Sequence, residues 1–194
     1  MTDLTFRFAE RKDIPLILRF IKELADYEGL LSEVVATEEI LETWIFDKEK
    51  AEVLLAVDKS GEEIGFALFF HNFSTFLGRA GIYLEDLYVS PVHRGKGYGK
   101  AILQKLAQIA VERGCGRLEW WCLDTNTPSI GFYLSLGAEP MSDWTVYRLA
   151  GDTLKKCSCT VEKHKTWIAS PATIPKSGER NRKIHSCMLY LISI

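Results

Sequence analysis

The segment that indicates the fold most clearly is Leu87-Tyr88-Val89-Ser90-Pro91-Val92-His93-Arg94-Gly95-Lys96-Gly97-Tyr98-Gly99-Lys100. It starts as an apolar strand and leads into residues 100–112, where apolar side chains recur at helical spacing. Glycines allow a backbone to approach a ligand closely, and the free N–H groups at a helix start point toward an anion. Arg94 and Lys96 add positive charge there. The segment predicts an anion-binding loop, with a plain turn before a helix as the alternative.

Two common phosphate-binding loops are disfavoured. A Walker loop needs four residues between its glycines, followed by Gly-Lys-Ser/Thr, and that pattern is missing here. A Rossmann loop sits near the first strand of a parallel repeat, whereas this loop lies halfway along the chain, after predicted antiparallel hairpins.

Hydrophobic periodicity predicts the remaining elements. Asp13 is a candidate N-cap for the first helix, with Pro15 just inside it. The expected helices are 14–27, 37–46, 100–112 and 127–136, and the expected strands are 4–8, 53–57, 64–70, 81–89, 118–122 and 147–149. Hairpins combined with crossover helices indicate an α/β (α+β-like) domain over residues 1–156, with a mixed, mostly antiparallel sheet and helices on both faces.

Composition narrows the class of protein. The 194 residues are 47% hydrophobic, enough for one domain with a substantial core. No run of 18 residues lacks charge and the start resembles no signal peptide, so neither membrane insertion nor secretion is expected. The five cysteines fit neither a disulfide framework nor a metal knuckle, which favours a reduced, cytoplasmic protein without a metal.

Charge is distributed unevenly. Residues 157–194 carry six Lys or Arg against two Asp or Glu, so this appendage is +4 and the rest of the chain is −6. An acidic body argues against nucleic acid as a partner and suits a cationic small molecule. The appendage also loses the periodicity of the body, and we leave open whether it is a read-through terminus or an interaction tail.

The loop and its surroundings resemble the GCN5-related N-acetyltransferase (GNAT) superfamily, whose motif is Arg/Gln-x-x-Gly-x-Gly/Ala. The resemblance covers roughly residues 4–155 and is greatest to the diamine (spermidine/spermine or thialysine) acetyltransferase branch. The matching segments are 21–28, 83–89 and 126–133.

The resemblance implies acetyl-CoA as co-substrate. The backbone of the strand before the loop would bind the pantetheine arm, and the loop amides would hold the pyrophosphate. A solvated helix-start lysine is the alternative for Lys96 and Lys100, and a simple N-cap is the alternative for Asn126. The implied cofactor-binding residues are Leu87, Tyr88, Val89, Arg94, Gly95, Lys96, Gly97, Tyr98, Gly99, Lys100, Asn126, Ser129 and Tyr133.

The same resemblance implies the catalytic groups. Aminolysis of a thioester requires a neutral amine and is helped by a proton donor to the leaving thiolate. Tyr133 matches the family's donor, and Glu85 matches the group that takes the amine's proton, directly or through water. Glu85 and Asp86 are consecutive, so on a regular strand they point to opposite faces. The alternatives are a packed tyrosine and solvent-facing acids.

The acceptor pocket is expected at the end of the first helix. Carboxylates and an aromatic ring there suit a substrate with spaced ammonium groups. The expected substrate-binding residues are Tyr27, Glu28, Glu85, Asp86 and Trp144. His71 and His93 have no recognisable triad partners, and we assign them no chemistry.

Three functions follow in order of preference. The first is an acetyltransferase for a small diamine or amino acid, in which the amine attacks the thioester directly. The resemblance also implies a homodimer. The second is an acetyltransferase for a protein lysine or N-terminus. The third is an inactive acyl-CoA-binding module, against which the presence of Tyr133 and Glu85 counts.

Overall fold

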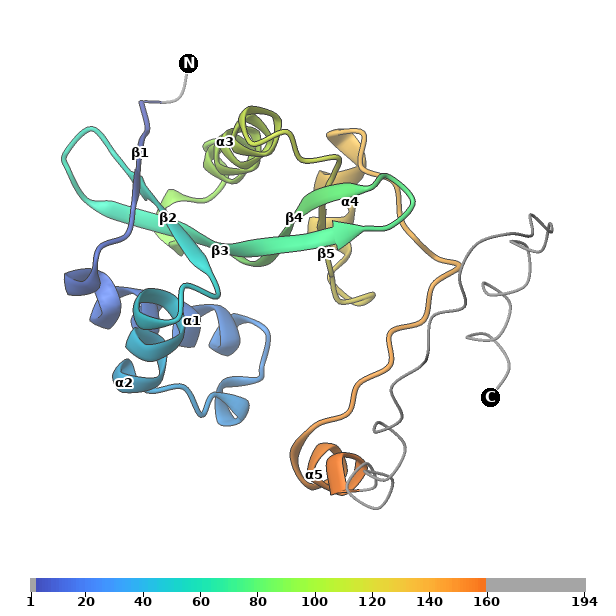
Figure 1. Ribbon diagram of the computed structural model, residues 1–194. Coiled ribbons are helices and arrows are strands. Elements are labelled where there is room, and N and C mark those ends of the chain that lie inside the picture. Colours follow the sequence, from blue (N-terminus) through green and yellow to red (C-terminus); the bar gives the residue numbers. More distant parts are fainter. Residues whose placement is uncertain (1–2, 160–194) are drawn as a thin grey trace, which may run out of the picture. The chain divides into compact units, whose positions relative to one another are not determined.

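A computed structural model describes residues 3–159. The chain divides after Ala138 into two units, so the described parts of these units are residues 3–138 and 139–159. The first unit is built on a five-stranded sheet of order β1-β2-β3-β4-β5 (Figure 1). The first three neighbouring pairs are antiparallel, and β4 and β5 are parallel. The strands are β1 Thr5–Phe8, β2 Glu52–Val57, β3 Glu63–Ser74, β4 Arg79–Val89 and β5 Leu118–Trp120.

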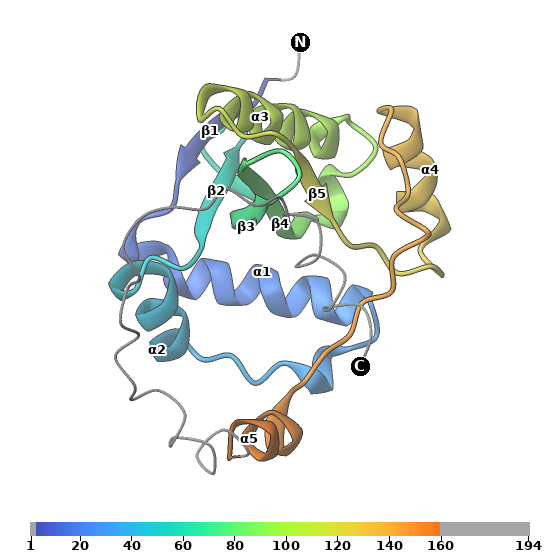
Figure 2. The same cartoon turned by 45° about the vertical axis from the view of Figure 1, so that its right-hand side comes forward.

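Helices cover both faces of this sheet, as predicted. Helix α1, Ile14–Tyr27, lies on one face and α3, Tyr98–Glu112, on the other (Figure 2). Strand β2 shows why both faces need cover, since its four central residues are all buried. Val53 and Leu55 pack with the α1 core, and Leu54 packs with the α3 core. The α/β class with a mixed, mostly antiparallel sheet is confirmed.

Shorter helices complete the first unit. Thr37 caps the second helix with its hydroxyl, which accepts from the Ile40 amide at 3.3 Å. The predicted 37–46 helix is divided into α2, Glu38–Leu41, and a π-helical continuation, η3, Glu42–Asp47. The others are α4, Thr127–Ser135, and the 3-10 helices η1 Arg11–Asp13, η2 Leu31–Glu33 and η4 Pro91–His93.

Asp13 occupies the predicted N-cap position of α1, with Pro15 just inside the helix, but its side chain makes no hydrogen bond to the α1 amides. Asp13 ends η1 in a helical backbone conformation and makes no side-chain cap. Its carboxylate instead accepts from the Arg7 guanidinium at 2.6 and 2.9 Å and from the Glu10 amide at 2.7 Å. An ion pair with a residue six positions earlier is invisible to a capping rule.

Strand β4 contains an irregularity with consequences for the site. Leu68 of β3 pairs with Asp86, but the next residue, Phe69, pairs with Leu84. Glu85 is therefore an extra residue in β4, a β-bulge. Leu84 packs in the α3 core, whereas Tyr88 packs in the α1 core. The bulge thus reverses the alternation, and Asp86 shares the α1 face with Tyr88 although it is two residues from Leu84.

The second unit contains one helix within its described part, α5, Gly151–Cys159. The predicted strand 147–149 was wrong: these residues are in no strand, and Tyr147 is 91% exposed. Apolar alternation alone does not make a strand without a neighbouring strand to bond. The expected boundary between 156 and 157 falls inside α5, and residues 160–194 lie outside the described part. No helix between residues 3 and 159 has the length and apolar character needed to cross a bilayer.

Candidate active site

The glycine loop leads directly into α3, as the sequence predicts. Gly95 and Gly97 have φ values of +75° and +80°, a conformation that side-chain-bearing residues rarely adopt. Helix α3 begins at Tyr98, two residues earlier than expected, and Gly97 precedes it without a side-chain cap. The amides of the first turn thus have no capping side chain and can meet an anion.

One edge of β4 is open beside this loop. Strand β5 pairs with β4 only from Ile82 to Leu84. Within residues 3–159, β4 from Glu85 to Val89 pairs with no strand other than β3, and the Val89 carbonyl also accepts from the Arg94 side chain. The β5 side of Leu87, Tyr88 and Val89 thus has no strand partner in the described part, and an extended chain could form hydrogen bonds there.

Three carboxylates act on one another near the bulge. Burial, followed by repulsion from Glu85 and Glu28, raises the pKa of Asp86 to about 6. Burial also raises the pKa of Glu28, which follows the last residue of α1. Glu85 is exposed. Asp86 is thus a half-buried acid on the α1 face, the face that the resemblance assigns to the acceptor, and the exposed Glu85 lies at its rim.

Tyr133 of α4 belongs to the same group of side chains. Burial, followed by the charges of Cys122 and Glu28, raises its pKa to about 12. Its ring lies 5.0 Å from that of Trp120, centroid to centroid. At neutral pH this hydroxyl is therefore protonated and carries a proton that it can donate, although its raised pKa makes it a weaker acid than a free phenol.

Other predicted residues have more limited contacts. Asn126 caps α4, its side-chain oxygen accepting from the Ser129 amide at 3.4 Å, so the N-cap alternative describes what the structure shows. Lys96 and Lys100 are exposed around the loop. Trp144 lies in the second unit and is 70% exposed, so its role in the acceptor pocket stays a prediction.

Sequence reasoning missed two participants. Cys122 influences Tyr133 electrostatically, and burial, Glu28 and Asp124 raise its own pKa. Glu23 accepts a hydrogen bond from the Tyr88 hydroxyl at 2.8 Å. Glu23 lies four residues before Tyr27 and so on the same face of α1, and this spacing could have predicted that it lies near the site.

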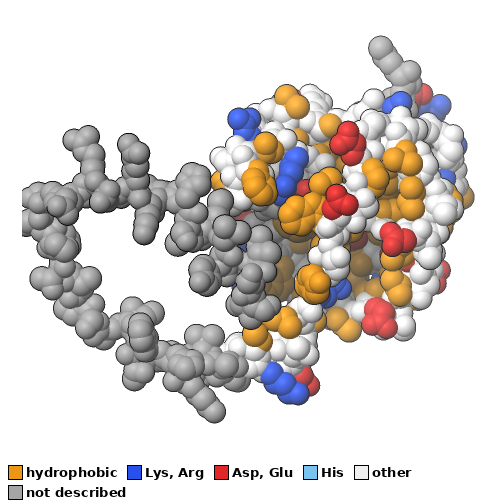
Figure 3. All heavy atoms as spheres, turned by 90° about the vertical axis from the view of Figure 1, so that its right-hand side faces the viewer, with side chains coloured by type: hydrophobic (Ala, Val, Ile, Leu, Met, Phe, Trp, Pro, Cys, Tyr) orange, Lys and Arg blue, Asp and Glu red, His pale blue; other side chains and the backbone are white. Residues whose placement is uncertain are grey.

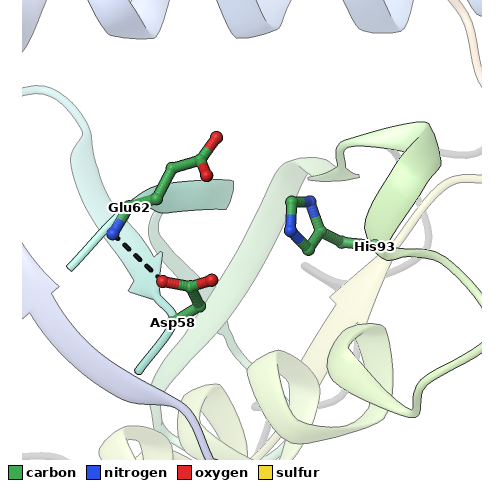
Figure 4. Close-up of side chains that lie close together, drawn as sticks. All are labelled: Asp58, Glu62 and His93. Carbon is green, nitrogen blue, oxygen red and sulfur yellow. Dashed lines mark hydrogen bonds between the residues drawn. The ribbon is translucent and has the colours of Figure 1, made fainter. Parts of the chain in front are cut away.

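A group of potential metal ligands lies at the β2–β3 turn and at His93, just before the loop. Asp58, Glu62 and His93 each offer an atom within 4.8 Å of the others (Figure 4). Asp58 already has a structural role, because one carboxylate oxygen accepts from the Ser60 amide, the Ser60 hydroxyl and the Glu62 amide at 2.8, 2.6 and 3.1 Å. These bonds form the β2–β3 turn, and we assign no ion to the group.

Comparisons with known proteins agree with this geometry. A family model described as the acetyltransferase (GNAT) family matches residues 20–138. The thialysine N-epsilon-acetyltransferase of Bos taurus is 35% identical over 167 residues, covering 80% of this chain and 98% of that protein. The L-ornithine N5-acetyltransferase NATA1 of Arabidopsis thaliana is 30% identical, covering 77% of this chain and 85% of that protein.

A solved structure supports the fold. An integron cassette protein from the mobile metagenome of V. cholerae superposes with a TM-score of 0.68 at 29% identity, covering 81% of this chain and 99% of that one.

Proposed function

Since the chain belongs to the GNAT acetyltransferase family and is an N-acetyltransferase, we propose that it transfers acetyl from acetyl-CoA to a primary amine of a small cationic acceptor. The observation that carries the proposal is the grouping of Tyr133, Glu28 and Asp86 beside the open edge of β4. A proton donor, a proton acceptor and negative charge for a cation lie together there.

Acetyl-CoA, the acetyl donor, would bind mainly to backbone groups of β4 and the glycine loop. The open edge of Leu87, Tyr88 and Val89 suits the amide groups of a pantetheine arm. The amides from Gly95 to Lys100 suit a pyrophosphate, with Lys96 and Lys100 adding charge. Asn126, Ser129 and Tyr133 would border the arm from α4. When bound, acetyl-CoA supplies a thioester, an acyl group already activated toward an amine.

Proton transfer falls to the side chains. Direct attack forms the C–N bond and breaks the C–S bond. One proton leaves the nitrogen of the neutral amine for a carboxylate, and one passes from the Tyr133 hydroxyl to the departing thiolate. The phenolate then regains a proton from solvent and the carboxyl group releases one, so the net reaction is amine plus thioester to amide plus thiol. The resemblance favours Glu85 as the acceptor of the amine's proton. We place Asp86 in that role, because it is half-buried on the α1 face and its pKa of about 6 makes it an ionised but still basic carboxylate at neutral pH.

Acceptor choice follows from charge. Glu28, Glu85 and Asp86 supply negative charge for ammonium groups, Tyr27 supplies an aromatic face, and Trp144 stays a proposed wall. The relatives named for thialysine and L-ornithine support an acceptor with a second ammonium group. We therefore expect small diamines and diamino acids to be better substrates than protein lysines.

A thiol-release assay tests the proposal. Acetyl-CoA is mixed with thialysine, ornithine, putrescine, spermidine or a lysine-containing peptide, and free CoA is measured. We expect turnover with at least one small amine and little with the peptide. Turnover with the peptide alone would favour the protein acetyltransferase, and CoA binding without any turnover would favour the inactive binding module.

Assembly and location complete the proposal. We propose a cytoplasmic homodimer with neither membrane nor nucleic-acid partners. The dimer is consistent with the exposed apolar side chains of Phe73, Phe76 and Trp121 and with the hydrophobic side chains on the face drawn in Figure 3. Light scattering after size exclusion gives the mass directly, and a monomer at micromolar concentration would contradict it.

A further inference from the structure

The side chain of Arg94 joins the glycine loop to helix α1. Its Nε donates to the carbonyl of Val89, at the end of β4, over 2.9 Å. Its guanidinium carbon lies 4.4 Å from the centroid of the Tyr27 ring and 5.5 Å from that of Tyr88. The side chain thus reaches from the loop to the end of α1.

The two tyrosines under Arg94 differ in how firmly they are held. Tyr88 is 3% exposed, donates its hydroxyl hydrogen bond to Glu23 and packs 5.6 Å from the Phe20 ring, centroid to centroid. Tyr27 ends α1 and is 53% exposed. An exposed ring at a helix end has rotamer freedom that a cation over its face restricts. Arg94 therefore matters most to Tyr27.

Arg94 also forms part of a groove next to the acceptor residues. The groove has a volume of about 480 Å³ and is bounded by α1, the β2–β3 turn, the end of β4 and the loop. Its lining includes Glu23, Asp26, Tyr27, Glu62, Tyr88 and Arg94. Arg94 lies over the two rings within this groove, so its charge and that of the acidic lining residues face the same space.

We propose that Arg94 is a positioning residue that fixes Tyr27 and so links the cofactor loop to the acceptor end of α1. It begins the loop that is to hold the pyrophosphate, and Tyr27 immediately precedes Glu28, whose charge acts on Asp86 and Tyr133. The link to the acceptor rests on the proposed function. Because such coupling is reciprocal, an ordered loop strengthens amine binding and a bound amine strengthens CoA binding by the same factor.

Hydrogen exchange tests the link without any substrate. The Glu28 amide donates to the Leu24 carbonyl at 3.0 Å and the Leu30 amide to the Ala25 carbonyl at 2.8 Å, so both report opening of the α1 end. In the CoA-free protein, Arg94→Gln should speed their exchange about three- to fivefold. Lys48→Gln, which removes a cation 3.8 Å from the Trp44 ring centroid, should leave these amides unchanged. Equal exchange in wild type and Arg94→Gln would overturn the proposal.

Kinetics test the consequence for the acceptor. Arg94→Gln and Tyr27→Leu should each raise the amine KM about three- to fivefold, and Tyr27→Leu, which does not touch the loop, should leave the Kd for CoA within about twofold of wild type. The double variant should be no worse than either single one, and Arg94→Lys should recover part of the loss. If Arg94→Gln instead weakens CoA binding and leaves the amine KM and the exchange unchanged, Arg94 is a phosphate ligand and the proposal fails. If no amine is acetylated by the wild type, the proposed function fails, and the exchange experiment still decides the role of Arg94.

Discussion

The loop Arg94–Lys100 and the carboxylate group around Asp86 are the two ends of the site that we propose, and they are built in different ways. The loop depends on backbone: two glycines with positive φ and a helix start without a capping side chain. The carboxylate group depends on side chains from α1, the β4 bulge and their packing. A site built from backbone should keep its binding after many side-chain substitutions but not after loss of a glycine. A site built from side chains should lose activity when one carboxylate oxygen or one hydroxyl is replaced. The following predictions separate the two ends.

Tyr133→Phe should have the largest effect, at the side-chain end. Removing the hydroxyl removes the proton donor and should lower kcat about 10²–10³-fold. The Kd for CoA, measured by titration calorimetry, should remain within about twofold because the ring still packs near Trp120. Unchanged kcat would show that the thiolate leaves without help from this residue.

Asp86→Asn should lower kcat by about 10²-fold, since an amide cannot accept the amine's proton. Glu85→Gln is the matched comparison on the neighbouring residue. Because Glu85 is exposed at the rim, we expect a smaller loss, mainly in the amine KM. If the two variants exchange these effects, Glu85 is the proton acceptor, as the family resemblance favours.

Gly97→Ala should damage the backbone end. A Cβ at a φ of +80° costs roughly 1–2 kcal/mol, so the loop should shift and the Kd for CoA should rise about tenfold. Gly131→Ala in α4, where an added Cβ would meet no atom within 4 Å, is the control and should bind CoA normally. Equal Kd values for both variants would mean that the loop conformation is unimportant for the cofactor.

Stability should respond in the opposite direction to activity at Asp86. Its folded pKa of about 6 lies above the ordinary value of 3.8. The carboxyl therefore favours the folded state below pH 4, and this contribution is lost as the pH rises through about 6. At pH 8, Asp86→Asn should raise Tm by a few degrees, corresponding to about 1–3 kcal/mol. The gain should vanish at pH 4, and a lower Tm at both pH values would show that the carboxylate is satisfied in the fold.

The difference between a loop built from backbone and a carboxylate group built from side chains also explains what the sequence could predict. Glycine spacing and helical periodicity are local, so the loop, α1, α3 and the first four strands follow from them within a few residues. The expected role of the β4 backbone in binding the pantetheine arm comes only from the family resemblance. The bulge follows from neither, because it depends on how β4 registers against Leu68 and Phe69 of β3.

This one register shift decides which acid faces α1. Simple alternation would place Asp86 on the face of Leu84, and the extra residue Glu85 moves it to the face of Tyr88. The Arg7–Asp13 ion pair and the reach of Arg94 to Tyr27 escape prediction for the same reason. They join residues whose proximity is set by packing. The 147–149 strand failed because no strand lies beside it to complete its hydrogen bonds within the described part of its unit.

The pH dependence of kcat at saturating acetyl-CoA and amine tests most directly whether the bulge delivers Asp86 as the proton acceptor. In the wild type, kcat should fall about tenfold per pH unit below about pH 6, because the Asp86 carboxylate becomes protonated there. This fall is the slope that Asp86 adds to the plot of log kcat against pH. In Asp86→Asn this additional slope should be absent, while Glu85→Gln should retain it. An acid limb that persists in Asp86→Asn and disappears in Glu85→Gln would contradict the account.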